Sequence, residues 1–418
     1  MNIESMSILK LKRIVEWIPI VGWLATIMTA AHFFSIAEKV CMCILAVGLG
    51  LDILLNIRTH QWRYRRSVWV YIGCIFLFLL IPLWRLFGLE PSADIVSYIE
   101  CFLPFLLLGL LGVYGWGQQL RIEWLALAML TALLVENVFI CTQIDMAQLF
   151  TIMHVDINVF NAYRNEHIFS HMAYGMYANV ALIMGFAAIR SKLPLWLKIV
   201  LGIEMAQTIF FLVLTEGRVG YTTMLILLAM MVFAALWRRS RSVAIAASLV
   251  AVVIGAFMLR QMLSEGGKDT VNDPRMAIWP VAVNVAKEYP ILGQGPKTGH
   301  DKFVARGMED EKFQNRYMFT YIECFGEESL GDMHPHNIFL EQWIAFGIVG
   351  LIVLLYVLIA PLFCVSSTRR WEIAMLLIVF IGQGMFEKMG RDVSPLLYMM
   401  SLIPLMATDA ELCDSKAS

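Results

Sequence analysis

Apolar runs close to the length that crosses a bilayer constrain the fold of this chain more than any other feature. They include residues 68–83, 101–113, 219–237 and 243–259. About 20 apolar residues span the hydrocarbon core as a helix, because a helix pairs its own backbone groups there. The composition agrees, with 59% hydrophobic and 16% charged residues. The sequence therefore predicts an all-α polytopic membrane protein.

Basic clusters predict how the chain crosses the membrane. Lys and Arg gather at 10–13, 58–66, 190–198, 238–241 and 369–370, which all fall on the side of the N-terminus if the chain has twelve spans. The positive-inside rule then predicts that both termini are cytoplasmic. The spans are expected at about 17–35, 38–56, 68–87, 96–117, 123–143, 172–189, 195–214, 219–237, 243–261, 337–365, 372–388 and 393–408.

Two long segments are expected on the opposite, periplasmic face, at 145–171 and 262–336. Loops of this length are usually functional or disordered. The second divides the chain into predicted parts at 1–261 (nine spans), 262–336 (one large periplasmic loop) and 337–418 (three spans and a cytoplasmic tail). The net charge of −1, segregated along the chain, gives no reason to expect a nucleic-acid partner.

The large loop contains a predicted helix over 274–288, with Asp273 as N-cap and Pro274 at the first helical position. Pro290 and Gly293 then end it. Because its apolar residues share one face, we expect an amphipathic helix near the membrane surface. These residues are Ala277, Ile278, Val281, Val285 and Ala286.

Two arginines on the predicted periplasmic face are candidates for binding an anion. Arg218 interrupts an apolar stretch and is either a snorkelling anchor paired with Glu216 or a clamp for phosphate oxygens. Arg275 lies in the first turn of the loop helix, where the dipole disfavours a cation. That misfit favours anion binding over a solvated surface charge.

The run Asp332-Met333-His334-Pro335-His336-Asn337 ends the large loop and begins the next apolar span. His334 and His336 could belong to a metal site, although no third ligand is evident, or His336 could only bond the backbone at the helix start. We favour His336 as a general base, because a neutral imidazole can remove a hydroxyl proton.

Three further polar segments have simpler interpretations. The run 293–295 (Gly-Gln-Gly) resembles part of a nucleotide-binding loop, but it follows a helix and is predicted to be a turn. Arg391-Asp392, in the short loop before the last span, is either an ion pair at the membrane edge or part of the site. The run Arg164-Asn165-Glu166-His167 and also His171 are polar enough to line a cavity, but a surface loop is the favoured interpretation.

Motifs on either side of these candidates resemble a known superfamily, the O-antigen ligases and polymerases. Thr215-Glu216-Gly217-Arg218 is similar to its T-x-[ST]-R element, with Gly217 where a small or hydroxyl residue is usual. Arg275 and Trp279, followed by the run 290–295 (Pro-Ile-Leu-Gly-Gln-Gly), resemble its loop signature, which ends in P-x-x-G-x-G.

A third motif covers the entry to the next span. His336-Asn337-Ile338-Phe339-Leu340 and then Gly347-Ile348-Val349-Gly350-Leu351 resemble the superfamily's H-N-x-x-L…G-x-x-G element. The motifs occur in the superfamily's order and directly cover 215–351, whereas the first 200 residues match only in hydropathy. The H-x-H-N form and Gly390-Arg391-Asp392 resemble lipopolysaccharide O-antigen ligases more than polymerases.

The resemblance implies a GT-C-like, inverting glycosyltransferase of the bacterial inner membrane that needs neither metal nor cofactor. Its donor would be a glycan on undecaprenyl pyrophosphate, and its acceptor a sugar hydroxyl of lipid A-core. Arg218 and Arg275 would hold the pyrophosphate and His336 would deprotonate the acceptor. The other expected substrate-binding residues are His334, Asn337 and Arg391.

Two alternatives remain open at this stage. A Wzy-type polymerase shares the donor and the chemistry but uses a second lipid-linked glycan as acceptor; the loop 145–171 has only Arg164, which favours a ligase over it. A transporter of lipid-linked glycans predicts charged residues in the middle of several spans. Few candidates exist, namely Asp52, Glu100, Glu136 and Glu204.

The predicted topology can be tested with reporter fusions. A reporter that is active only in the periplasm should be active when fused after about residue 300. The same reporter should be inactive when fused after Arg241 or Arg370. The opposite pattern would invert the topology and separate the motifs from the periplasm.

Overall fold

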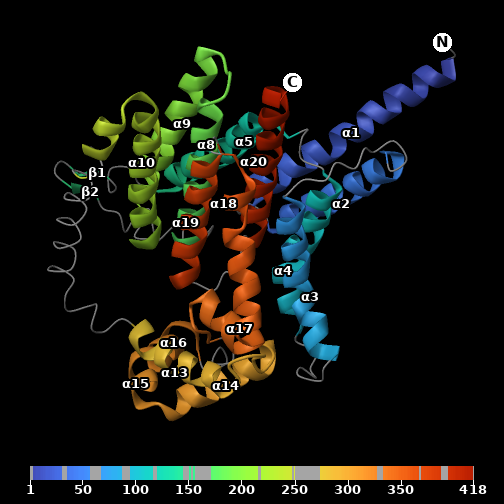
Figure 1. Cartoon of the computed structure of the whole chain (residues 1–418). Helices are drawn as coiled ribbons and strands as arrows, with labels where there is room; N and C mark the ends of the chain where they lie inside the picture. Colours follow the sequence, from blue (N-terminus) through green and yellow to red (C-terminus); the bar gives the residue numbers. More distant parts are fainter. Residues whose placement is uncertain are drawn as a thin grey trace.

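The computed structural model describes residues 3–30, 35–56, 67–86, 95–115, 120–144, 150–151, 154–155, 171–214, 218–246, 249, 274–326, 333–366, 369–386 and 394–417. Within these residues a bundle of long helices stands on a small group of short helices (Figure 1). The loop 145–171 also contains two short strands that the sequence analysis did not predict, β1 (Phe150–Thr151) and β2 (His154–Val155), paired antiparallel.

The bundle contains most of the helical residues. Its helices are α1 (Ile3–Thr29), α2 (Ser35–Asn56), α3 (Val68–Leu86), α4 (Ile95–Tyr114), α5 (Ile122–Gln143), α8 (His171–Ile189), α9 (Leu195–Val213), α10 (Arg218–Arg239), α17 (Ile338–Ile359), α18 (Pro361–Cys364), α19 (Arg370–Phe386) and α20 (Ser394–Ala417).

These helices overlap the predicted spans, except for 243–261, of which only 243–246 and 249 are described. Helix α1 begins at Ile3, well before the predicted start at 17, and α20 continues to Ala417, past the predicted end at 408. By length and composition, helices at 68–86, 122–143, 195–213, 219–237 and 338–364 can cross a membrane, and further apolar helices in the described residues are shorter. The chain therefore has the character of a polytopic membrane protein. The number of twelve spans stays a prediction.

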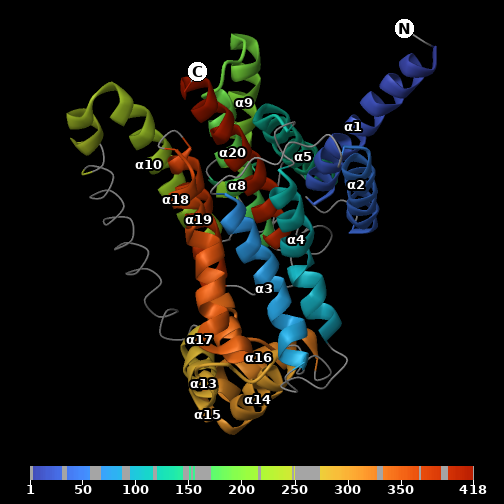
Figure 2. The same ribbon diagram turned by 45° about the vertical axis from the view of Figure 1, so that its right-hand side comes forward.

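The two ends of the described chain lie on the same side of the bundle, well apart from each other (Figure 1). The start of α1 and the end of α20 are both remote from the small group of helices, in two views turned by 45° (Figure 2). An even number of crossings produces this arrangement. Which end faces the cytoplasm stays a prediction.

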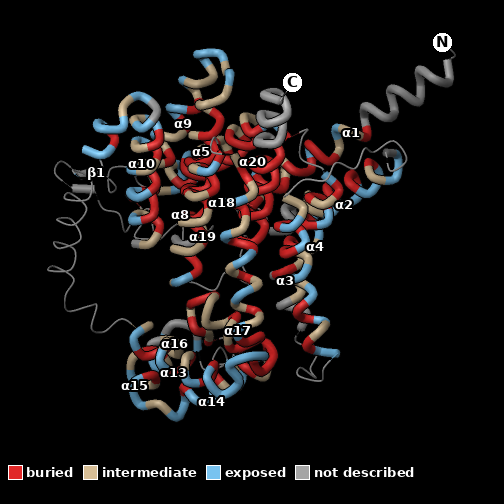
Figure 3. The backbone as a smooth tube through the Cα atoms, viewed as in Figure 1, coloured by how far each residue is buried: buried red, intermediate tan, exposed pale blue. Residues whose placement is uncertain are grey.

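The small group of helices is a loop domain with a core of its own. It comprises α13 (Arg275–Glu288), α14 (Pro296–Glu309), α15 (Glu311–Phe313), the π-helix η1 (Gln314–Met318) and α16 (Phe319–Phe325). Figure 3 shows buried residues inside this domain as well as inside the bundle. The buried core of the domain consists of Ile278, Val281, Ala282, Val285, Ala286, Phe303, Phe313, Tyr317, Met333 and Ile344.

This core corrects the expectation of a helix lying on the membrane surface. Helix α13 has the predicted apolar face, but that face is buried against Phe303, Phe313 and Ile344 rather than turned to lipid. Apolar side chains of other loop residues were available to cover it, which a single helix pattern does not reveal. The helix begins at Arg275 with Pro274 as N-cap, and Asp273 lies outside the described residues.

Helix α17 is also not the single straight span that was expected. It is kinked at Gly347, where φ is 65° and ψ is −161°. The segment before the kink contributes to both cores: Ile344 is in the core of the loop domain, whereas Ala345 and Phe346 are in the core of the bundle. The large loop therefore continues structurally past its predicted end at 336.

The kink is filled by the turn at 290–295. An unbroken α-helix would pair the carbonyls of Ile344 and Ala345 with the amides of Ile348 and Val349. Instead, Gln294 N donates to Ile344 O (3.0 Å) and Gly295 N to Ala345 O (2.9 Å). Ile348 N donates to Pro290 O (2.8 Å) and Val349 N to Ile291 O (3.4 Å). The turn thus satisfies the four backbone groups that the kink exposes.

Two glycines make this close contact possible. A Cβ added to Gly347 would lie 2.1 Å from Ile291 O, and one added to Gly293 (φ 70°) would lie 2.5 Å from the carbonyl of Ala345. A tryptophan from the bundle supports the same turn, because Trp84 Nε1 of α3 donates to Leu292 O (2.6 Å). The turn therefore joins the loop domain, α17 and α3.

We expect Gly347→Ala to destabilise the protein by about 2–4 kcal/mol, because it adds backbone strain and a backbone clash at the same place. The measurement is thermal unfolding of the purified chain in detergent. Gly202→Ala is the matched control, since a Cβ at Gly202 in α9 meets nothing within 4 Å. Equal unfolding temperatures for the two variants would show that the kink does not depend on glycine.

Candidate functional site

Asn337 joins the start of α17 to the end of α19. Its Oδ1 accepts hydrogen bonds from Phe339 N (3.0 Å) and Leu340 N (3.1 Å), which caps α17. Its Nδ2 donates to Met385 O (3.1 Å), close to the last described residue of α19. With 7% of its surface exposed, Asn337 has a structural role that the sequence analysis did not assign to it.

Arg275 lies at the same junction. Its guanidinium donates to Phe386 O (3.4 Å) and stands 5.6 Å from the centre of the Phe386 ring. The Trp279 ring, one turn along α13, lies 6.1 Å from that of Phe386. Because α19 ends at Phe386, its carbonyl end offsets the unfavourable dipole at the start of α13. The dipole misfit alone therefore does not identify an anion site.

The two histidines form a pair of tilted rings beside this junction. The ring centres of His334 and His336 are 4.3 Å apart, with an angle of 35° between the planes. His336 has φ 49°, a left-handed conformation that is uncommon for residues other than glycine. Strained backbone of this kind clusters at functional sites. Within the described residues, no group of three His, Cys, Asp or Glu side chains is placed to bind a metal ion.

Arg218 begins α10, and its backbone lies at the same end of the bundle. Helix α10 packs against α8 and α19, and a Cβ on Gly382 of α19 would lie 3.5 Å from Thr223 Oγ1 of α10. Both the start of α10 and the end of α19 point toward the loop domain in Figures 1 and 2. The contacts of the Arg218 side chain lie outside the described structure, as does Arg391.

The structure thus brings Arg275, His334, His336 and Asn337 to one junction between α13, α17 and α19. It confirms that residues 293–295 form a turn, which packs into the α17 kink. Sequence reasoning missed Tyr317 of η1, whose hydroxyl lies 3.2 Å from His336 Nε2. Nothing in the sequence around Tyr317 distinguishes it from Tyr321, one turn further along.

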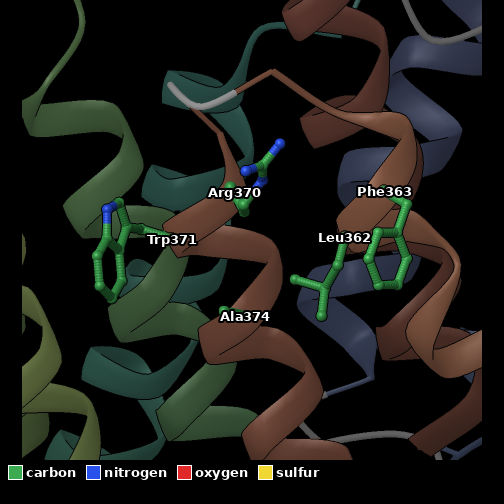
Figure 4. Close-up of a pocket in the computed structure, with 5 residues that line it drawn as sticks. All are labelled: Leu362, Phe363, Arg370, Trp371 and Ala374. Atoms are coloured by element: carbon green, nitrogen blue, oxygen red, sulfur yellow. The ribbon is translucent and has the colours of Figure 1, made fainter.

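A cavity of about 560 Å³ lies elsewhere, lined by Leu362, Phe363, Arg370, Trp371 and Ala374 (Figure 4). These residues belong to α18 and the start of α19, whereas Arg275 and Asn337 contact the end of α19. The cavity is therefore at the opposite end of the bundle from the histidines, and we do not assign the site to it.

Comparisons with known proteins agree with the location of the motifs. Residues 205–355 match the family model described as O-antigen ligase. A protein of Haemophilus influenzae named "Uncharacterized protein" is 29% identical over 101 residues, which are 24% of this chain and 22% of that protein. The matched region contains every described candidate residue and the α17 kink. Residues 205–355 are therefore similar to the O-antigen ligase domain, and the rest of the chain lies outside this match.

Proposed function

We propose that this protein is an O-antigen ligase, which transfers a glycan from undecaprenyl pyrophosphate to a sugar hydroxyl of lipid A-core. The observation that carries the proposal is the junction of Arg275, His336 and Asn337 inside the domain that matches the family. It combines a cation, a titratable imidazole and a capped helix start at the edge of a membrane-spanning bundle.

The chemistry needs one base and cationic support for the leaving group. His336 takes the proton of the acceptor hydroxyl while the oxygen attacks the anomeric carbon of the glycan. The bond between that carbon and the pyrophosphate oxygen breaks, and undecaprenyl pyrophosphate leaves with the electron pair. Attack from the opposite side inverts the configuration, and the reaction requires no metal.

Arg275 and Arg218 would hold the pyrophosphate. A guanidinium binds phosphate oxygens with two parallel hydrogen bonds. Arg275 contacts Phe386 O at 3.4 Å, and a guanidinium carries five N–H donors in all. His334, Asn337 and Arg391 complete the proposed binding surface, Asn337 by fixing the start of α17.

The proposal includes a place in the cell and a division of the chain. The protein lies in the bacterial inner membrane as a GT-C-like bundle of about twelve spans, with both termini in the cytoplasm and the site in the periplasm. We propose that the chain divides into 1–261, 262–336 and 337–418. The core of the loop domain also includes Ile344, which lies in α17 before the kink at Gly347.

Ligase and polymerase are distinguished by the lipopolysaccharide of a strain that lacks this protein. Loss of the whole O-antigen ladder on a gel, with accumulation of the lipid-linked donor, supports a ligase. A single O-antigen unit on lipid A-core indicates the alternative, a polymerase. Loss of the ladder with the donor retained on the cytoplasmic face would instead indicate a transporter.

We expect Arg275→Ala and Arg218→Ala to abolish transfer while the protein remains in the membrane. Loss of a charge-assisted contact to a buried phosphate costs about 2–5 kcal/mol. Substitution by Lys should restore activity only in part, because the planar fork is lost. Arg306→Ala is the control, since Arg306 is exposed and paired with Glu288 and Glu309. Normal transfer by Arg218→Ala would make that residue a membrane anchor.

We expect His336→Ala to be far more damaging than His334→Ala in a transfer assay with the purified chain. General-base assistance is worth about 10²–10⁴-fold. Activity should fall as the pH is lowered, because a protonated imidazole cannot accept the proton, and EDTA should leave it unchanged. Inactivation by EDTA with rescue by Mg²⁺ or Mn²⁺ would instead make the histidine pair a ligand set.

A further inference from the structure

Tyr317 contacts His336 in two ways. Its hydroxyl oxygen lies 3.2 Å from His336 Nε2, and the two rings meet edge to face with centres 5.8 Å apart. The residues come from different segments, η1 and the loop that precedes α17. The contact therefore depends on the tertiary structure of the loop domain.

Tyr317 is itself held firmly by the core of that domain. Only 6% of it is exposed. Its ring meets Phe313 edge to face at 5.2 Å, and Phe313 meets Phe303 in the same way at 5.6 Å. Both phenylalanines are fully buried. The series Phe303, Phe313, Tyr317 thus fixes the hydroxyl in front of His336.

The local backbone at both residues departs from regular structure. Tyr317 lies on a π-helix, a rare element that often occurs at functional sites. His336 has φ 49°. A left-handed conformation at a residue other than glycine persists where the surrounding structure imposes it.

We propose that Tyr317 is a positioning residue that holds His336 in the tautomer protonated at Nε2, so that Nδ1 accepts the proton of the acceptor hydroxyl. This proposal rests on the proposed function of His336 as base. The Tyr317 oxygen accepts a hydrogen bond from Nε2–H, which fixes the plane of the imidazole and determines which nitrogen carries a lone pair.

The direction of this hydrogen bond follows from the role of a base. An imidazole that gains a proton becomes positively charged, and an acceptor at its other nitrogen stabilises that charge. A donor at that nitrogen would oppose it. The side chains that face the imidazole of His336 include Tyr317 on η1 and His334, which lies two residues before His336. Arg275 of α13 and Asn337 each donate to a backbone carbonyl at the end of α19.

The first test measures the pH dependence of transfer by the purified full chain in detergent. Tyr317→Phe should lower kcat about 10–100-fold, as loss of a partner that orients a histidine commonly does. It should change KM little and move the acid limb of the pH profile to lower pH. Tyr321→Phe is the control, because Tyr321 packs against Tyr317 with ring centres 5.5 Å apart and lies one turn further along. It should behave as the unaltered protein.

An acid limb that does not move, or that moves to higher pH, would overturn the proposal even if kcat falls.

The second test does not depend on activity. In ¹⁵N NMR spectra of the histidine-labelled full chain above neutral pH, the signals lost in His336→Gln should show a protonated Nε2 and an unprotonated Nδ1. The reverse pattern overturns the proposed tautomer. Full activity of His336→Ala would refute the base and leave the NMR result standing.

Discussion

The exchange of backbone hydrogen bonds between the turn at 290–295 and the kink of α17 is the constraint on which the rest of the structure depends. A break in a helix at the edge of a membrane exposes amides and carbonyls whose burial is costly unless they are paired. The turn pairs those of Ile344, Ala345, Ile348 and Val349. The sequence pattern P-x-x-G-x-G at 290–295, together with Gly347, thus describes two backbone segments that pair with each other.

This constraint fixes the loop domain relative to the bundle, and with it the candidate site. Ile344 packs into the core of the loop domain and Phe346 into the core of the bundle, so the start of α17 is held from both sides. Asn337 then ties that start to α19, whose end also contacts Arg275. His336 lies between the Asn337 cap and the aromatic series that ends at Tyr317. A cation and an imidazole from distant parts of the chain are thereby held at one junction.

Much of this could be predicted, because the signals are local. Apolar runs of bilayer length predicted the long helices, and the spacing in α13 predicted its buried face. The kink could not be predicted, since a glycine in an apolar run is compatible with a straight helix until the turn that fills the kink is known. The Tyr317–His336 contact was missed for a related reason: it joins residues far apart in sequence. The structural role of Asn337 toward Met385 was missed in the same way.

We propose, as the central point, that this chain transfers a lipid-linked glycan to lipid A-core. The most direct measurement combines the purified protein with undecaprenyl-pyrophosphate-linked glycan and lipid A-core in detergent, and identifies the products by mass spectrometry. The account predicts lipid A-core carrying the glycan together with free undecaprenyl pyrophosphate. A longer glycan that remains on undecaprenyl pyrophosphate, with lipid A-core unchanged, would contradict it.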